Sequence, residues 1–107
     1  MIRVKDPLHN NITLTKKYWI KHIIKEHPEM KLFYNELRDT IKEPEYIFKS
    51  KISKSSRLYF KGYLHPEYGH FYIMAVVDYK EYKKTGFIKT SFPTYNLKKS
   101  GELLWKK

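Results

Sequence analysis

The sequence contains no cysteine, and this absence excludes two classes of site. Without thiols the chain can form neither a disulfide framework nor a thiolate zinc site. Glycine is also scarce, with 4 residues in 107, and no glycine-rich phosphate-binding loop is present. The longest apolar run, FYIMAVV at 71–77, is far too short to cross a bilayer. The stretch MIRVKDPLHNN lacks the apolar segment of a signal peptide, so we expect a cytoplasmic protein.

Acidic residues are half as frequent as basic ones, and the imbalance predicts a polyanionic partner. Lys and Arg number 22 against 11 Asp and Glu, which gives a formal net charge of +11 at pH 7. Ten tyrosines favour RNA as this partner, because aromatic rings among lysines suit base stacking beside phosphate contacts. The alternative is that the lysines only keep the surface soluble. No segment combines a basic face with a broad apolar one, so we expect no membrane binding.

Residues 2–15 are predicted to form two short extended pieces around a turn, and the segment from Lys16 to Pro44 has the apolar spacing of helices. Thr15 is suited to cap a helix that begins at Lys16 and carries an apolar stripe at spacings of three and four. His27 precedes a proline, which disfavours helical geometry there. Pro28 suits the first position of a second helix, which should stop before Pro44.

After Pro44 the apolar spacing changes to that of strands. The segment 70–79 is apolar on both faces and should be the central strand of a sheet. The tail 101–107 can add a short edge strand. The predicted strands are 45–50, 57–64, 70–79 and 87–92. This order predicts an α+β domain in which two N-terminal helices pack on one face of a roughly four-stranded antiparallel sheet.

The strand 57–64 alternates between basic or aromatic residues and apolar ones. Its basic and aromatic side is a single row, because alternate strand residues share a face: Arg57, Tyr59, Lys61 and Tyr63. We predict that this row lies on the sheet face away from the helices. The alternative is a solvated face with no role in binding.

The strand 87–92 should continue the same face. Burial of Ile88 and Phe92 would leave Lys89 and Ser91 exposed beside the row that contains Arg57. A β-bulge would reverse this pattern, so Thr90 remains a candidate for the exposed face.

The helical stretch WIKHIIKEHPE, residues 19–29, contains two histidines five residues apart. His22 lies about 60° from Trp19 on the helical wheel, at the edge of the apolar stripe. His27 falls at the junction of the two helices, where it can act in catalysis or simply cap backbone groups. A spacing of five is not the i, i+4 spacing that places two imidazoles together on one helix, so we predict no metal site.

These segments together resemble a known group of nucleases. WIKHIIKEHPE, RLYF, FYIMAVV and GFIKTSF are similar to segments of small toxin-like domains of the barnase–EndoU–colicin–RelE superfamily, in particular its phage-associated branch. The resemblance covers roughly residues 3–92 and implies one toxin-like nuclease domain over residues 1–107 with a barnase- or RelE-like fold. It also implies metal-independent cleavage of RNA without a cofactor, and an acidic antitoxin or immunity protein as a further partner.

The resemblance also implies a set of site residues. The residues that match catalytic positions are His22, His27, Arg57, Tyr59 and Thr90. The residues expected to contact the nucleic acid are Lys61, Tyr63, Lys89, Ser91 and Tyr95. One departure concerns the last strand, where a small residue and then a tyrosine are expected after the threonine and this chain has Ser91 and Phe92. The role of that tyrosine is missing here or passes to Tyr95 or Tyr59.

The residue types fit such a reaction. Cleavage by the 2′-hydroxyl needs a base, a cation for the developing phosphorane charge and an acid, and histidine can act as base or acid at neutral pH. Arg57 can grip phosphate oxygens with its planar fork. The alternative is a non-catalytic nucleic-acid-binding module that uses the same face, and a third hypothesis is a protein that binds an acidic protein. A shared cleft for His22 and Arg57 would favour the nuclease.

Overall fold

The structure is a computed structural model that describes residues 1–97 and 101–107. One sheet contains seven strands: β1 (Ile2–Lys5), β2 (Asn11–Leu14), β3 (Tyr46–Lys49), β4 (Ser56–His65), β5 (Gly69–Lys80), β6 (Thr85–Thr94) and β7 (Leu103–Lys106). The first helical segment consists of α1 (Lys16–Tyr18), a π-helical turn (Trp19–Ile23) and α2 (Ile24–Glu26). The second consists of a 3₁₀ turn (Pro28–Phe33) and α3 (Tyr34–Lys42), and a further 3₁₀ turn (Glu81–Lys83) joins β5 to β6.

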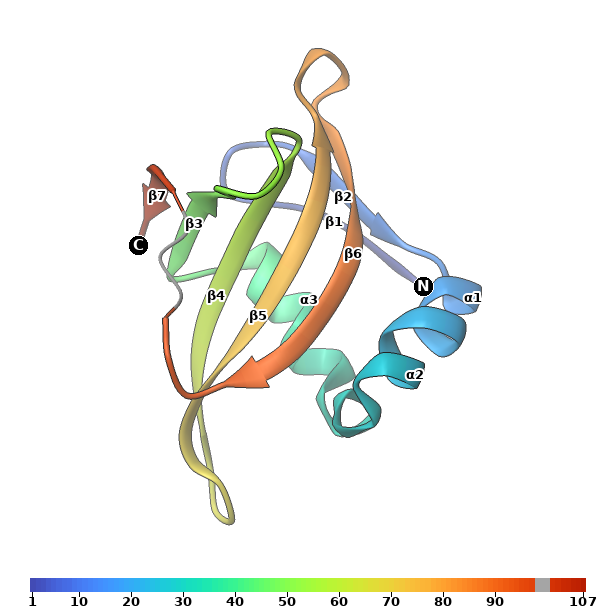
Figure 1. Ribbon diagram of the computed structural model, residues 1–107, viewed down its shortest axis with the longest axis vertical. Coiled ribbons are helices and arrows are strands. Elements are labelled where there is room, and N and C mark those ends of the chain that lie inside the picture. The colour runs from blue at the N-terminus through green and yellow to red at the C-terminus, as the bar shows by residue number, and fades with distance from the viewer. Residues whose placement is uncertain (98–100) are drawn as a thin grey trace.

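The predicted four-stranded antiparallel sheet is wrong, because the sheet has seven strands and is mixed. The strand order is β1-β2-β6-β5-β4-β3-β7, and β2 pairs with β6 in parallel while the other neighbours are antiparallel. The strands curl strongly around the molecule, and the helices are short beside them (Figure 1). The N-terminal hairpin and β7 extend the sheet at opposite ends. Local apolar spacing reveals extended segments, but it does not reveal which distant strands they join.

The ends of the helices follow the side-chain chemistry of the sequence. The Thr15 hydroxyl accepts a hydrogen bond from the Tyr18 N–H at 3.2 Å, which confirms the predicted cap. The first helical segment ends at Glu26, and Pro28 opens the second. The second ends at Lys42, before Pro44. None of the described helices is long and apolar enough to cross a membrane.

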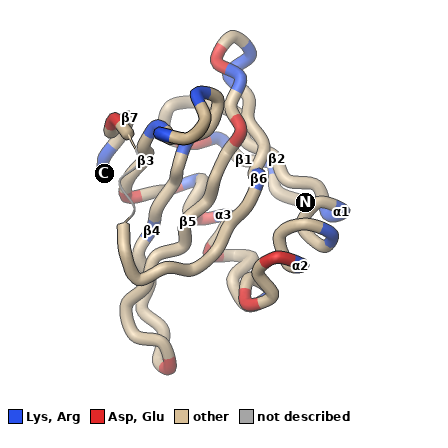
Figure 2. Tube along the Cα trace, in the orientation of Figure 1, with Lys and Arg blue, Asp and Glu red and all other residues tan. Residues whose placement is uncertain are grey.

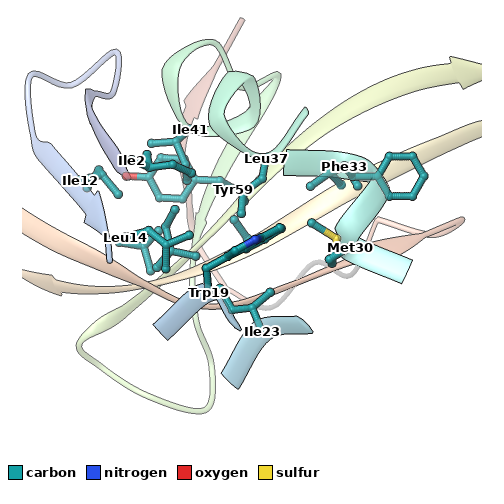
Figure 3. Close-up of a cluster of buried hydrophobic side chains, with 14 of the residues drawn as sticks. Ile2, Ile12, Leu14, Trp19, Ile23, Met30, Phe33, Leu37, Ile41 and Tyr59 are labelled. Carbon is teal, nitrogen blue, oxygen red and sulfur yellow. The ribbon is translucent and has the colours of Figure 1, made fainter. Parts of the chain in front are cut away.

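Both helical segments contribute to one hydrophobic core on one face of the sheet (Figure 3). Its helical members are Trp19, Ile23, Met30, Phe33, Leu37 and Ile41. Its strand members are Ile2, Ile12, Leu14, Ile47, Tyr59, Phe71, Ile73, Ala75, Val77 and Ile88. Because β1 and β2 supply three of these side chains, the N-terminal hairpin is an integral part of the core.

The opposite face of the sheet carries a second, smaller cluster of buried apolar side chains: Phe48, Leu58, Phe60 and Met74. Leu97, beyond the end of β6, packs against it. Both faces of the central strands are therefore apolar, as the sequence of β5 predicted.

A buried carboxylate joins the β1–β2 loop to the centre of the sheet. Asp6 is 3% exposed and accepts hydrogen bonds from the Leu8 N–H at 3.0 Å and from the Asn10 N–H at 2.8 Å. The Asn10 side-chain amide and the Tyr59 hydroxyl also donate to this carboxylate. His9 adopts a left-handed conformation with φ 67°, which lets the chain turn around Asp6. The loop thus closes one end of the core with its polar groups satisfied.

This network predicts a stability effect at Tyr59. In Tyr59→Phe the buried Asp6 carboxylate loses one donor, so the free energy of unfolding should fall by about 1–3 kcal/mol. Tyr72→Phe is the matched control, because the Tyr72 hydroxyl has no hydrogen-bond partner among the described residues, and its effect should stay below about 0.5 kcal/mol. Urea unfolding followed by circular dichroism measures both, and equal losses in the two variants would contradict the role of the network.

Candidate nucleic-acid interface

The row of Arg57, Tyr59, Lys61 and Tyr63 shares one face of β4, but the predicted exposure of this face is wrong. Tyr59 is fully buried in the main core. Tyr63 is half-buried, and its hydroxyl donates to the Glu36 carbonyl at 2.7 Å and lies 3.1 Å from the Thr40 hydroxyl. Tyrosine can replace an aliphatic residue in a core when its hydroxyl finds a partner, and both hydroxyls have one here. These two tyrosines are therefore structural.

The strand β6 contains the bulge that the sequence left open. Val76 pairs with Thr90 and Val77 pairs with Ile88, so Lys89 is the extra residue between them. The bulge places both Ile88 and Ser91 on the buried side. Ser91 is 0% exposed and donates to the Met74 carbonyl at 2.8 Å, so the expected exposure of Ser91 is wrong.

Thr90 is half-buried, and its hydroxyl oxygen is buried with no hydrogen-bond partner among the described residues. A buried hydroxyl without a partner is unusual in a folded protein, and its burial keeps the oxygen from direct contact with a molecule that approaches β6. Lys89, beside it, is exposed.

His22 lies on the exposed side of the first helical segment, close to β6. Its imidazole stacks on the Tyr18 ring with centroids 4.4 Å apart. The Tyr18 hydroxyl in turn donates to the Lys89 carbonyl at 2.9 Å. Tyr18 therefore connects the helix to β6 and orients the imidazole at the same time.

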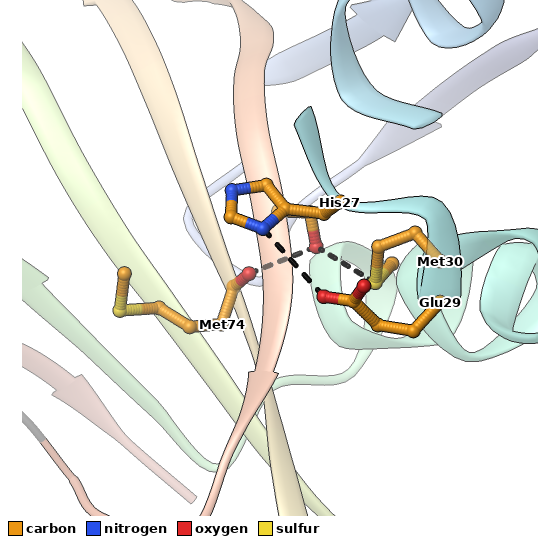
Figure 4. A network of polar contacts seen from close by, with 5 residues as sticks. His27, Glu29, Met30 and Met74 are labelled. Atoms are coloured by element: carbon orange, nitrogen blue, oxygen red, sulfur yellow. Dashed lines mark hydrogen bonds and ion pairs between the residues drawn. The ribbon is translucent and has the colours of Figure 1, made fainter. Parts of the chain in front are cut away.

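His27 lies at the junction between the two helical segments, over the strand β6 (Figure 4). Its backbone leaves the helical region, with φ −133° and ψ 77°, as expected before a proline. The side chain is 30% exposed, and Nδ1 lies 3.6 Å from the Glu29 Oε1. The ring packs on Phe92 with centroids 5.0 Å apart. His27 is thus positioned by a carboxylate on one side and an aromatic ring on the other.

We use the name β6 edge site for His22, His27, Lys89 and Thr90. The pairing of β2 with β6 involves only Thr85–Phe87, so the rest of β6 adjoins the helical segments on that side. His27 contacts β6 directly through Phe92, whereas His22 reaches it through Tyr18, whose hydroxyl bonds to the Lys89 carbonyl. Two imidazoles therefore adjoin the same edge of the sheet, and the Lys89 side chain lies toward the other face, where it lines a groove with Leu58 and Met74.

Arg57 lies apart from the β6 edge site. It pairs with Val77 of β5, and Val77 pairs with Ile88 of β6, so β5 and part of β6 stand between Arg57 and the helix that carries His22. At the usual strand spacing the backbones of β4 and β6 are separated by ~10 Å. The Arg57 guanidinium lies over the Tyr79 ring, 3.7 Å from its centroid.

The remaining predicted contact residues lie elsewhere on the surface. Lys61 is half-buried, and its ammonium lies 5.7 Å from the centre of the Tyr63 ring. Tyr95 is 67% exposed, and its hydroxyl is 3.4 Å from the Tyr68 carbonyl. Within the part of the chain that the structure describes, neither side chain makes a hydrogen bond or ring contact with His22 or His27.

Sequence reasoning missed the supporting residues Asp6, Tyr18, Glu29 and Tyr79. Tyr18 lies four residues before His22 in a helix, so the spacing could have indicated that the two rings stack. Glu29 follows His27 by two residues across Pro28, a distance that a local contact can span. The contacts of Asp6 with Tyr59 and of Tyr79 with Asn10 join distant parts of the chain, and no local pattern indicates them.

Across residues 1–97 and 101–107, no group of three or more His, Asp or Glu side chains is arranged to hold a metal ion.

Burial is the main reason that the pKa of Tyr59 is raised well above the ordinary value, and the Asp6 charge adds to it. Burial likewise raises the pKa of Tyr63.

The two raised pKa values predict a loss of stability at high pH. Because the unfolded chain releases these protons near pH ~10 and the folded chain keeps them, stability from these groups is complete below pH ~10. Above that pH the free energy of unfolding should fall by up to about 1.4 kcal/mol per pH unit for each group. Urea unfolding between pH 8 and 11 measures the slope, and Tyr63→Phe should reduce it. Stability that rises with pH in this range would contradict the prediction.

Comparison of the chain with known protein families, with curated proteins and with solved structures gives no match.

Proposed function

We propose that this chain is an endoribonuclease, toxin-like or phage-associated, that cleaves RNA at the β6 edge site without a metal. The observation that carries the proposal is that both histidines are held at the edge of β6 by aromatic rings: His27 packs on Phe92, and His22 stacks on Tyr18, whose hydroxyl bonds to the Lys89 carbonyl. Membership of the barnase–EndoU–colicin–RelE superfamily is part of the same proposal and rests on the sequence resemblance.

The chemistry needs no group beyond these side chains. A base removes the proton of the ribose 2′-hydroxyl, and the oxygen attacks the adjacent phosphorus. The bond from phosphorus to the 5′-oxygen breaks, and an acid protonates that oxygen. The products are a 2′,3′-cyclic phosphate and a 5′-hydroxyl, so atoms and charge balance.

We assign the role of base to His27, because Glu29 lies beside its ring. The carboxylate oxygen 3.6 Å from Nδ1 stabilises the imidazolium that forms when the ring accepts a proton. His22 then serves as the acid for the leaving 5′-oxygen. Lys89 supplies positive charge to the phosphorane.

The second candidate is a non-catalytic nucleic-acid-binding module. It is favoured by the separation of Arg57 from the histidines and by the burial of Tyr59, which remove two of the five expected catalytic residues from the site. Of the residues the structure describes, no lysine or arginine lies within 4.0 Å of a carboxylate, so the cations remain available to phosphates in either case.

Substitution of the histidines should separate catalysis from binding. His27→Gln and His22→Gln should each lower the cleavage rate by ~10²–10⁴-fold while changing RNA affinity much less, since proton transfer acts mainly in the transition state. His70→Gln is the matched control, because His70 is also exposed and lies outside the β6 edge site. The measurement is gel-based cleavage of a labelled RNA with EDTA present.

A substrate with a 2′-deoxy sugar at the scissile position tests whether the 2′-hydroxyl is the attacking group. Cleavage of this substrate, or a requirement for added metal, would exclude attack by the 2′-hydroxyl. Tight RNA binding without cleavage, even when ribosomes are supplied, would favour the binding module.

RNA affinity should depend steeply on salt in both cases. Each neutralised phosphate of a single strand contributes ~0.7 to the slope of log affinity against log salt, so contacts with roughly three phosphates predict a slope near −2. Fluorescence anisotropy with a deoxy-substituted oligoribonucleotide measures it. A flat slope would mean that the net charge of +11 serves only solubility.

A further inference from the structure

A basic pocket lies at the end of the sheet where the β3–β4 loop approaches the β5–β6 turn. Its volume is about 490 Å³, and Lys49, Lys54, Arg57, Tyr79 and Glu81 are among its lining residues. Lys and Arg occur on both of these connections in Figure 2. None of these five belongs to the β6 edge site, so the pocket is a separate feature of the molecule.

The Arg57 guanidinium is held in a fixed position in this pocket. It lies over the Tyr79 ring, 3.7 Å from the centroid, and the Tyr79 hydroxyl donates to the Asn10 side-chain oxygen at 2.8 Å. Asn10 is itself tied to the buried Asp6. A rigid chain of contacts therefore connects the guanidinium to the core, and a fixed fork loses little freedom when it binds a ligand.

The same guanidinium lacks an acceptor. Its Nη1 is buried and has no hydrogen-bond partner among the described residues. Within residues 1–97 and 101–107, no carboxylate oxygen lies within 4.0 Å of the Arg57 side-chain nitrogens. The partly buried guanidinium charge is therefore not compensated by the protein, and an oxygen-rich anion beside it would be stabilised.

The charge balance of the pocket favours an anion. Lys49, Lys54 and Arg57 contribute +3, and Glu81 contributes −1. Asp78 lies nearby, but its carboxylate accepts hydrogen bonds from the hydroxyls of two serines, Ser55 at 3.0 Å and Ser56 at 3.4 Å. Even when Asp78 is counted in full, the sum is +3 − 1 − 1 = +1.

We infer that this pocket is a phosphate-binding site, separate from the β6 edge site, in which the Arg57 fork grips a phosphate group of a nucleic acid and Lys49 and Lys54 add charge. Guanidinium and phosphate match in a bidentate geometry, whereas the lysines act as point charges. The site holds the nucleic acid at a position removed from the histidines. It does not depend on cleavage, so it can exist in a nuclease or in a binding module.

Titration with inorganic phosphate at constant ionic strength tests the site directly. Nuclear magnetic resonance of the ¹⁵N-labelled full chain should give saturable shifts at the backbone amides of Lys54–Arg57 and at Tyr79. Lys54→Gln and Arg57→Lys should each weaken phosphate binding, and Arg57→Gln should weaken it by about tenfold or more, because a charge-assisted pair is lost. Arg57→Lys keeps the charge and removes only the fork.

Lys42→Gln is the matched control, because Lys42 is exposed at the end of α3 and its substitution removes the same charge as Lys54→Gln. It should leave phosphate affinity unchanged. Shifts spread evenly over the surface, or an equal loss in Lys42→Gln and Lys54→Gln, would overturn the proposal. Since Lys54 is exposed, its variant keeps the test valid if Arg57→Gln does not fold.

Two deoxy-substituted oligoribonucleotides, with and without a 5′-phosphate, identify the source of the phosphate. Equal displacement of inorganic phosphate by both assigns the site to a backbone diester. Stronger displacement by the 5′-phosphorylated strand assigns it to a terminal monoester. Failure of both strands to displace inorganic phosphate would overturn the assignment to a nucleic acid. None of these measurements requires cleavage, so their outcome is independent of the proposed ribonuclease activity.

Discussion

The hydrogen bond between the Tyr59 hydroxyl and the buried Asp6 carboxylate determines which way β4 faces. It brings the Tyr59 side chain into the core beneath the N-terminal loop, and strand alternation then places Arg57 and Tyr63 on the same side. Arg57 reaches Tyr79, and Tyr79 reaches Asn10 of the same loop. One buried carboxylate is therefore connected to the core, to β4 and to the basic pocket.

The elements could be predicted from the sequence, but the sheet could not. Thr15 and Pro28 act locally, so the helix boundaries follow from side chains within a few residues. The parallel pairing of Asn11–Thr13 with Thr85–Phe87 joins segments more than seventy residues apart, and no local pattern encodes it. The face of β4 was misassigned because tyrosine was counted as polar, although its ring can be buried when its hydroxyl finds a partner.

The residues predicted to form one site lie in two places, because contacts between distant segments position them. His22, His27, Lys89 and Thr90 adjoin one strand, since the helix that carries the histidines lies along β6. Arg57 lies on β4 and is connected to Asp6 through Tyr79 and Asn10. The bulge at Lys89, which the sequence only allowed as an alternative, decides that Ser91 is buried and that Thr90 is on the opposite side. Residue types suggested the kind of site, and tertiary contacts decided where each of its predicted residues lies.

The parallel pairing of β2 with β6 has a consequence for the timing of assembly. The histidine-bearing helix is synthesised long before β6, and until β6 emerges it has no strand against which to lie. Long-range pairings of this kind form late because loop closure must precede them. A nascent chain that has formed its helices therefore still lacks the strand against which Tyr18 and His27 pack. Any activity of the β6 edge site is withheld from the ribosome that makes the protein until most of the sheet has been translated.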